Sequence, residues 1–209
     1  ISTNKIYRNL NPYPFIPSNE FKDEDLSDVF NIQTHGLAKR LKHIGIDNAV
    51  IGVSGGLDST LALLVTVKAF EILGIPLDNI HGITMPGLGT TERTYTNAKS
   101  LMNALGITTK EISIIKAVTQ HFLDIGHDIN KHDITFENSQ ARERTQILMD
   151  YANMVNGLVV GTGNMSELAL GWATYNGDHM SMYAVNSGVP KTLVSILTRW
   201  IADTSLKED

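Results

Sequence analysis

The residues best suited to chemistry form a short loop, Ser54-Gly55-Gly56-Leu57-Asp58-Ser59, between a predicted strand and a predicted helix. Paired glycines permit backbone conformations that are closed to other residues, and they carry no Cβ atom to hold an anion away from the main-chain N–H groups. Those N–H groups and the positive end of the following helix would form a phosphate site. A tight turn of any βα unit explains the glycines, but not the two serine hydroxyls or the carboxylate.

The carboxylate of Asp58 gives a second indication of the ligand. A carboxylate at a phosphate site repels the phosphate unless a cation lies between them. Mg²⁺ is the hard ion that proteins hold through one or two carboxylates plus phosphate oxygens. The alternative is that Asp58 only caps the helix and favours its dipole. We expect Asp58 to hold Mg²⁺.

Strands and helices are expected to alternate along the chain around this loop. Strands are predicted at residues 49–53, 80–85, 107–112 and 158–161, and helices at 30–41, 58–73, 91–105, 138–156 and from 190 onward. This order predicts an α/β fold, a doubly wound parallel sheet flanked by helices, which binds ligands outside the carboxyl ends of its strands. Residues 126–137 should form a solvated loop, whose histidines show no metal-ligand spacing.

A second strand, loop and helix follow at residues 158–172. The exit loop of this strand should lie at the same sheet edge as the first, which would let Glu167 face Asp58 across one metal ion. Otherwise Glu167 is only a first-turn acid that favours the helix dipole. Trp172 and Tyr175 adjoin the site, and such rings can stack on a heteroaromatic ligand, although they are more often core or interface residues.

Two basic side chains are candidate anion contacts. Asn138 and Arg142 are one turn apart on a predicted helix, whereas Arg144 lies on the opposite flank of its buried stripe, so we expect Arg142 in the site. An exposed ion pair with Glu143 explains Arg142 equally well. Lys191 lies in the first turn of the last helix, where a cation is unfavourable unless an anion lies nearby.

Composition restricts the class of protein. A length of 209 residues suits one domain, and three prolines within residues 1–25 predict a linker or arm ahead of the main domain at 26–209. A net charge of −5 with scattered basic residues argues against a nucleic-acid surface. The absence of cysteine excludes a thiol nucleophile.

No apolar run could span a membrane and no signal pattern precedes the domain, so we expect a cytoplasmic protein. A first residue other than Met suggests a piece of a longer chain.

Five motifs carry a resemblance to a known family. They are GVSGGLDST at 52–60, MPGLGTTERTYTNA at 85–98, ENSQARERTQ at 137–146, GTGNMSELALGWATYNGDHMSMY at 161–183 and GVPKTL at 188–193. Through them, residues from about 11 to 201 resemble the synthetase domain of NAD synthetase, in particular its glutamine-dependent branch, a Rossmann-like domain of the ATP-pyrophosphatase type. The SGGxDS loop alone would also fit GMP synthetase or a tRNA-thiolating enzyme.

The resemblance implies ATP-dependent amidation of deamido-NAD to NAD through an acyl-adenylate, with release of AMP and pyrophosphate. It also implies a homodimer and an N-terminal glutaminase domain in the full-length protein. That domain needs a cysteine that this chain lacks, so the chain would use free ammonia. Two alternatives are another adenylating enzyme with the same loop, similar to GMP synthetase, and a module that binds ATP without turning it over.

The resemblance further implies roles for individual residues. ATP contacts are implied for Gly52, Val53, Ser54, Gly55, Gly56, Leu57, Asp58, Ser59 and Thr162. Contacts with deamido-NAD are implied for Asn138, Arg142, Glu167, Trp172, Ala173, Thr174, Tyr175 and Asp178. Asp58, Arg142 and Lys191 would take part in catalysis, and Asp58 and Glu167 would hold Mg²⁺.

Overall fold

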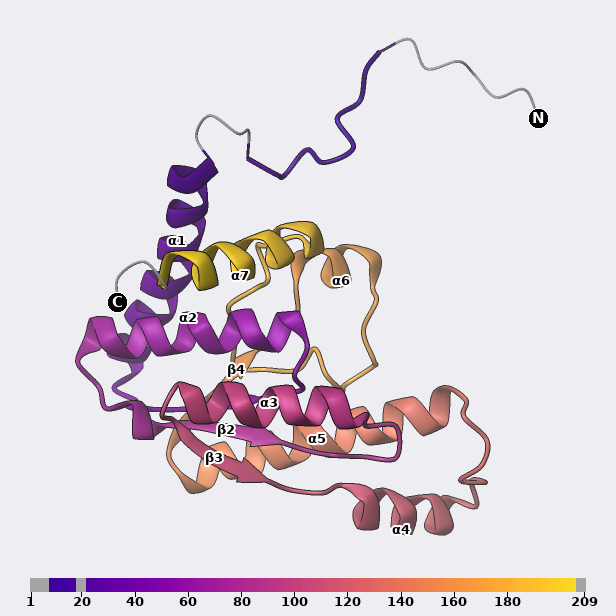
Figure 1. Cartoon of the computed structure of the whole chain (residues 1–209). Helices are drawn as coiled ribbons and strands as arrows, with labels where there is room; N and C mark the ends of the chain where they lie inside the picture. Colours follow the sequence, from indigo (N-terminus) through magenta and orange to yellow (C-terminus); the bar gives the residue numbers. More distant parts are fainter. Residues whose placement is uncertain (1–7, 18–21, 206–209) are drawn as a thin grey trace.

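The computed structural model describes residues 8–17 and 22–205 and has a parallel sheet at its centre (Figure 1). The strands are β1 Asn48–Gly52, β2 Ile80–Thr84, β3 Thr108–Glu111, β4 Gly157–Gly161 and β5 Tyr183–Ala184. They lie in the order β3-β2-β1-β4-β5, and every neighbouring pair is parallel. The predicted doubly wound α/β fold is therefore confirmed.

Helices cover both faces of this sheet (Figure 1). One face carries four helices, α1 Lys22–Ile44, α2 Leu57–Leu73, α3 Glu92–Ala104 and α7 Lys191–Ser205. The other face carries α4 Ile115–Ile125 and α5 Ile134–Met154. Two short elements, α6 Met165–Leu170 and the 3₁₀ turn η1 Leu77–Asn79, complete the described helices. Successive strand residues point to opposite faces. Ile51 of β1 therefore packs in the core beside α2, while Val50 packs in the core beside α5.

The path of the chain creates a crevice at one point of the sheet. From β1 the chain winds outward through β2 to β3, and it then returns to place β4 against the other side of β1. The loops after β1 and β4 therefore run in opposite directions from neighbouring strands. Open α/β sheets bind ligands at this kind of switch point.

The first helix begins earlier than predicted. Helix α1 begins at Lys22, eight residues before the predicted helix start at 30 and inside the predicted arm. Acidic residues in the first turn favour the helix dipole, and Leu26 is fully buried, so packing as well as propensity extends the helix. Residues 8–17 contain no helix or strand. Residues 1–7 and 18–21 of the predicted arm lie outside the described residues, and its boundary stays a prediction.

The prediction of a solvated loop at 126–137 is wrong at its carboxyl end. Helix α5 begins at Ile134, because Asp133 Oδ1 accepts hydrogen bonds from the N–H groups of Thr135 (2.9 Å) and Phe136 (3.2 Å). The side chain of His127 is also mostly buried rather than solvated, and its Nε2 lies 3.0 Å from Asp133 Oδ1. The helix α4 that precedes this loop was not predicted at all.

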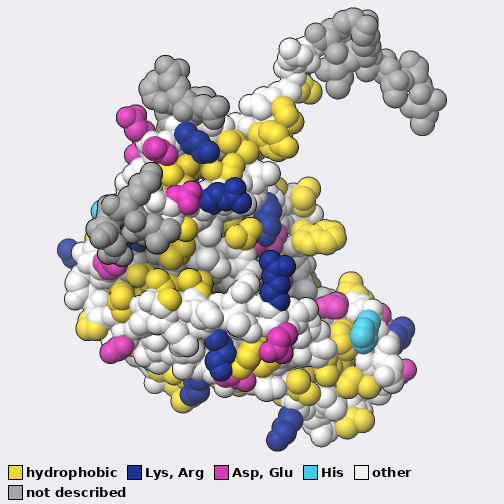
Figure 2. Space-filling model, viewed as in Figure 1, with side chains coloured by type: hydrophobic (Ala, Val, Ile, Leu, Met, Phe, Trp, Pro, Cys, Tyr) yellow, Lys and Arg dark blue, Asp and Glu magenta, His cyan; other side chains and the backbone are white. Residues whose placement is uncertain are grey.

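The surface charge and the helices bear on two kinds of protein that the sequence argues against, a nucleic-acid binder and a membrane-spanning protein. On the face shown in Figure 2, Lys and Arg side chains are scattered among acidic ones rather than gathered in one patch. Among residues 22–205, no helix has the length and apolar character needed to cross a bilayer.

Candidate active site

A cavity of about 570 Å³ lies at the carboxyl edge of the sheet, between the loops that leave β1, β2 and β4. Small-molecule sites commonly measure roughly 300–1,000 Å³. The predicted site residues in its wall are Gly52, Val53, Ser54, Gly56, Asp58, Ser59, Thr162, Glu167, Trp172, Ala173, Thr174 and Asp178. Six other predicted residues lie outside this wall: Gly55, Leu57, Asn138, Arg142, Tyr175 and Lys191.

The loop after β1 is held in shape by its own hydroxyl groups. Ser54 Oγ lies 3.1 Å from Ser59 Oγ, and Ser59 Oγ donates to the carbonyl oxygen of Gly56 at 3.0 Å. The N–H of Gly56 donates in turn to Ser54 Oγ at 3.3 Å. The two hydroxyls that the sequence predicts as phosphate ligands therefore also preorganise the loop.

The two glycines of the loop have different structural roles. Gly55 has φ of +81°, and a Cβ atom there would lie 2.0 Å from the carbonyl oxygen of Thr94 in α3. Gly56 has φ of −88° and ψ of 165°, an extended conformation open to any residue. The prediction that both glycines need a special backbone conformation is right for Gly55 and wrong for Gly56. Gly56 instead lines the cavity at the start of α2.

The start of α2 differs from the starts of three other helices. A side chain caps α3 (Thr91), α5 (Asp133) and α6 (Asn164), whereas Gly56 precedes α2 and provides no such cap. The first N–H groups of a helix have no partner within the helix. Because this end lies in the cavity wall, its N–H groups and its dipole favour an anion there.

The carboxylates of Asp58 and Glu167 both accept from Asn164, one from its side-chain amide and the other from its backbone N–H. Asn164 is fully buried, and its Nδ2 donates to Asp58 Oδ1 at 3.0 Å. Asn164 Oδ1 accepts from the N–H of Glu167 (3.1 Å), and Glu167 Oε2 accepts from the N–H of Asn164 (2.9 Å). Glu167 is therefore a capping-box residue of α6 as well as a residue of the cavity wall. Asn164-Met165-Ser166-Glu167 has the spacing of a capping box, which is the sequence signal that could have predicted the role of Asn164.

A cation stands beside the first of these carboxylates. Lys191 Nζ, from the first turn of α7, forms an ion pair with Asp58 Oδ2. The predicted anion near Lys191 thus includes a carboxylate of the protein itself. Within the described residues, no group of three or more His, Asp or Glu side chains is placed to hold a metal ion.

Arg144 rather than Arg142 lies in the cavity wall. Arg144 Nε donates to the carbonyl oxygen of Met85 at 3.1 Å. Burial lowers the pKa of its guanidinium, and the negative charges of Glu137 and Asp178 offset part of that effect. Arg142 is exposed, and its NH1 donates to the carbonyl oxygen of Tyr175 at 3.4 Å. The role of Arg142 in binding deamido-NAD stays a prediction.

Helix α5 holds the loop after β2 through two side chains one turn apart. Besides Arg144, Gln140 accepts a hydrogen bond at Oε1 from the N–H of Leu88 (2.9 Å). A Cβ atom at Gly87 would lie 2.6 Å from Gln140 Oε1 and 2.7 Å from Arg144 NH2. The loop therefore packs closely on α5, and neither Gln140 nor Arg144 was expected in this role.

The segment after α6 forms an exposed wall of the cavity. Trp172 and Tyr175 are each 79% exposed, which excludes a core role for either ring. Asp178 Oδ1 accepts from the N–H of Thr174 at 3.1 Å and fixes the turn between them. A ring exposed beside a cavity is suited to stacking on a ligand or to packing in an interface.

Comparisons with known proteins agree on one family. A family model described as NAD synthase matches residues 29–204. The glutamine-dependent NAD(+) synthetase of Mycobacterium leprae is 44% identical over 210 residues, which are 98% of this chain and 31% of that protein. This chain therefore spans about a third of that relative.

Two solved structures share the fold. The glutamine-dependent NAD+ synthetase from Acinetobacter baumannii, in complex with ADP, matches with a TM-score of 0.77 and 28% identity, over 84% of this chain and 32% of that one. The NH3-dependent NAD synthetase from Campylobacter jejuni, in complex with nitrate, matches with a TM-score of 0.76 and 25% identity, over 85% of this chain and 73% of that one.

Proposed function

The chain belongs to the NAD synthase family, and from this membership we propose that it joins ammonia to the carboxyl group of deamido-NAD with consumption of ATP. The observation that carries the proposal is the uncapped start of α2 behind the Gly55 loop, in the wall of a cavity at the switch point of the sheet. Such a helix start accepts the phosphates of a nucleotide.

The proposed reaction has two steps. A carboxylate oxygen of deamido-NAD attacks the α-phosphorus of ATP, and the bond to the bridging oxygen of pyrophosphate breaks. Ammonia then attacks the acyl carbon, loses a proton to solvent, and displaces AMP. Neither step needs a protein nucleophile, so a chain without cysteine can perform both. Catalysis then depends on alignment of two anionic substrates and on neutralisation of the charge on the leaving group.

The residues of the wall suit these tasks. The hydroxyls of Ser54 and Ser59 and the first N–H groups of α2 would bind the phosphates of ATP, and Thr162 would contact the nucleotide from the loop after β4. Lys191 would neutralise charge on the departing pyrophosphate. The exposed ring of Trp172 would stack on a heteroaromatic part of deamido-NAD.

We propose Asp58 and Glu167 as the residues that hold Mg²⁺. Both carboxylates lie in the wall of one cavity and share Asn164, and the capping box occupies only one oxygen of Glu167. Carboxylate oxygens are the hard donors that Mg²⁺ prefers. A bound Mg²⁺ would supply positive charge between these carboxylates and the phosphates.

We further propose that the chain acts as a homodimer and as part of a longer, glutaminase-containing protein. The apolar side chains of Leu168, Leu170 and Trp172 are exposed, Leu168 and Trp172 lie in the cavity wall, and this segment suits an interface. The share of the Mycobacterium leprae relative that the chain spans, 31%, supports further parts. Light scattering of the purified chain measures whether it is a dimer. The cytoplasmic location stays a prediction of the sequence.

Product analysis tests the proposed activity. Incubation with ATP, Mg²⁺, deamido-NAD and ammonium should yield NAD, AMP and pyrophosphate, and glutamine in place of ammonium should yield no NAD. Asp58→Asn, which keeps the side-chain shape, should lower the rate strongly. Formation of ADP, or turnover only with a purine nucleotide as acceptor, would contradict the proposal. ATP binding that Asp58→Asn leaves unchanged, without pyrophosphate release, would favour a non-catalytic module.

A further inference from the structure

We propose that Asn186 and Gln33 are positioning residues that set the spacing between the two halves of the nucleotide site, an inference that rests on the proposed function. Asn186 lies between β5 and α7 and is fully buried. Its Nδ2 donates to the carbonyl oxygen of Asp58 at 2.9 Å and to that of Thr162 at 3.1 Å. One amide group therefore joins the start of α2 to the loop after β4.

Gln33 fixes the orientation of this amide. It lies on α1, is 7% exposed, and donates through Nε2 to Asn186 Oδ1 at 3.0 Å and to the carbonyl oxygen of Val185 at 2.9 Å. An asparagine amide has a donor side and an acceptor side. Because Gln33 donates to the acceptor side, the donor side of Asn186 must face the two carbonyl oxygens of the site.

Gln33 leaves one of its own buried polar atoms without a partner. Gln33 Oε1 is buried and has no hydrogen-bond partner among the described residues. An apolar side chain at this position of α1 would avoid that cost, but it would leave Asn186 Oδ1 and the carbonyl oxygen of Val185 without their donor. A requirement for a donor at Asn186 explains why the glutamine is suited to this position.

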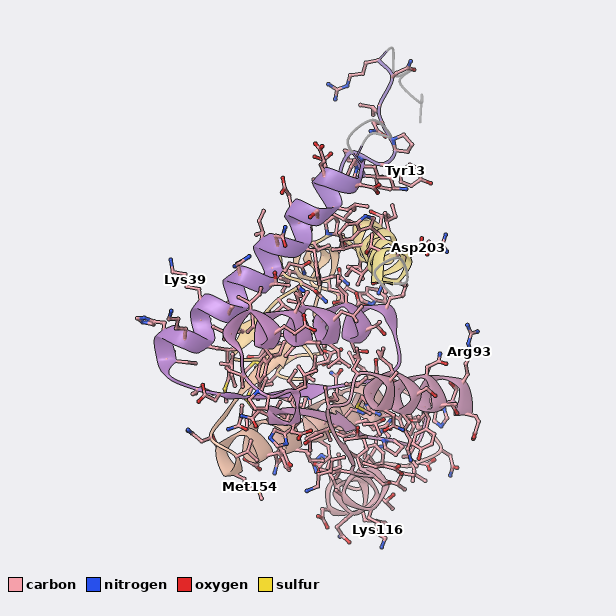
Figure 3. All side chains as sticks on the ribbon, turned by 60° about the vertical axis from the view of Figure 1, so that its left-hand side comes forward. Tyr13, Lys39, Arg93, Lys116, Met154 and Asp203 are labelled. Carbon is pink, nitrogen blue, oxygen red and sulfur yellow. The ribbon has the colours of Figure 1, made fainter. Side chains whose placement is uncertain are left out.

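The pair differs from the other buried amide of the site. Asn164 orients the carboxylate of Asp58, whereas Asn186 holds the main chain of Asp58 and reaches Thr162 as well. Gln33 adds α1, the long helix that packs against α2 and α7 and runs along the near side of Figure 3, where Lys39 points outward. The position of Asp58 is therefore fixed by Asn164 at the start of α6 and by Asn186 between β5 and α7, and Asn186 is held in turn by Gln33 on α1.

Isosteric substitutions test this role in the intact chain. Asn186→Asp places a carboxylate oxygen against two carbonyl oxygens, and Gln33→Met removes the orienting donor at similar length. We expect the Kd for ATP with Mg²⁺, measured by calorimetry, to rise about tenfold in Asn186→Asp and severalfold in Gln33→Met, the loss that follows when a buried hydrogen-bond donor is removed. The matched control is Thr34→Val, because Thr34 is the fully buried neighbour on α1 and donates only to Asn31, at 3.1 Å.

A double variant separates positioning from general stability. If Gln33 acts through Asn186, Gln33→Met should add no further loss of ATP affinity to Asn186→Ala, although both lower the melting temperature. ATP affinities equal to those of the wild type and Thr34→Val would overturn the inference, as would additive losses in the double variant. Should Asn186→Asp not fold, Gln33→Met alone decides. A wild type that binds ATP but forms no NAD would overturn the proposed function and leave this comparison intact.

Discussion

Replacement of Gly55 by alanine tests the geometry of the phosphate loop most directly. Gly55 has φ of +81°, and an added Cβ atom would lie 2.0 Å from the carbonyl oxygen of Thr94 and 2.9 Å from its carbonyl carbon. An L-residue in the left-handed conformation costs roughly 1–2 kcal/mol. The contact costs more, because an ordinary carbon to oxygen contact is about 3.3 Å long. The loop and α3 must therefore separate by more than an ångström.

That displacement should damage catalysis as well as stability. A shift of about 1 Å in a positioning element can lower the rate by about 100-fold. We therefore expect Gly55→Ala to reduce kcat/KM for ATP by about 100-fold, equivalent to about 2.7 kcal/mol of transition-state stabilisation. Steady-state NAD formation at varied ATP measures this effect, and thermal denaturation measures the accompanying loss of stability.

Gly74 provides the matched control at the other end of the same helix. It has φ of +68°, ends α2, and has no atom within 4 Å of an added Cβ. Gly74→Ala therefore introduces the same backbone strain without the contact, and it should lower the melting temperature while kcat/KM stays unchanged. If Gly55→Ala retained wild-type kcat/KM, or if Gly74→Ala lost as much, the argument from close approach to Thr94 would be refuted.

Three further predictions concern the cavity wall, a helix cap and the metal. Arg144→Leu should raise KM for ATP about tenfold, because it removes the charged hydrogen bond to the carbonyl oxygen of Met85 in the cavity wall. Arg142→Leu should instead raise KM for deamido-NAD. Equal effects of the two variants on both constants in steady-state assays would contradict this division. Desolvation raises the pKa of Asp133, but hydrogen bonds from Lys131 and from the first N–H groups of α5 outweigh it and hold the pKa well below its usual range. The stability that Asp133 contributes is thus present above about pH 4 and falls with the pH below that, so the difference in melting temperature between wild type and Asp133→Asn should shrink as acid is added. Excess EDTA should stop pyrophosphate release and added Mg²⁺ should restore it; release that continues with the chelator would remove the metal from the proposal.

The sequence predicted four of the five strands and the glycine loop after β1, but not the two-residue β5, because the signals of the former are local. The apolar run before Ser54, the glycines and the alternation of strands and helices each depend on neighbouring residues. Helix α4 was missed although Ile114, Val118 and Phe122 recur at helical spacing and are buried, because Ile114 at its N-cap position gives no capping signal. The position of Arg144 was missed because the sheet decides which flank of the α5 stripe faces the cavity, and the helix sequence does not contain that choice.

The long-range partners of the buried amides could not be predicted from the sequence. Gln33, Asn164 and Asn186 are polar residues of types that usually lie on the surface, and each is buried here because a distant segment supplies its partners. Each of the three amides has a partner more than 100 residues away along the chain. Local patterns in the sequence therefore predict residues of the cavity wall more readily than the buried residues that hold that wall in place.

The pairing of β1 with β4 has a consequence for how the chain acquires its activity. Ala49 lies opposite Leu158 in this pair, so its closure must await synthesis and collapse of the whole intervening segment. The cavity lies along that seam, so its two walls come together only when β1 and β4 pair. An incompletely synthesised chain would display the glycine loop without its opposite wall, and ATP affinity would therefore report on completed folding.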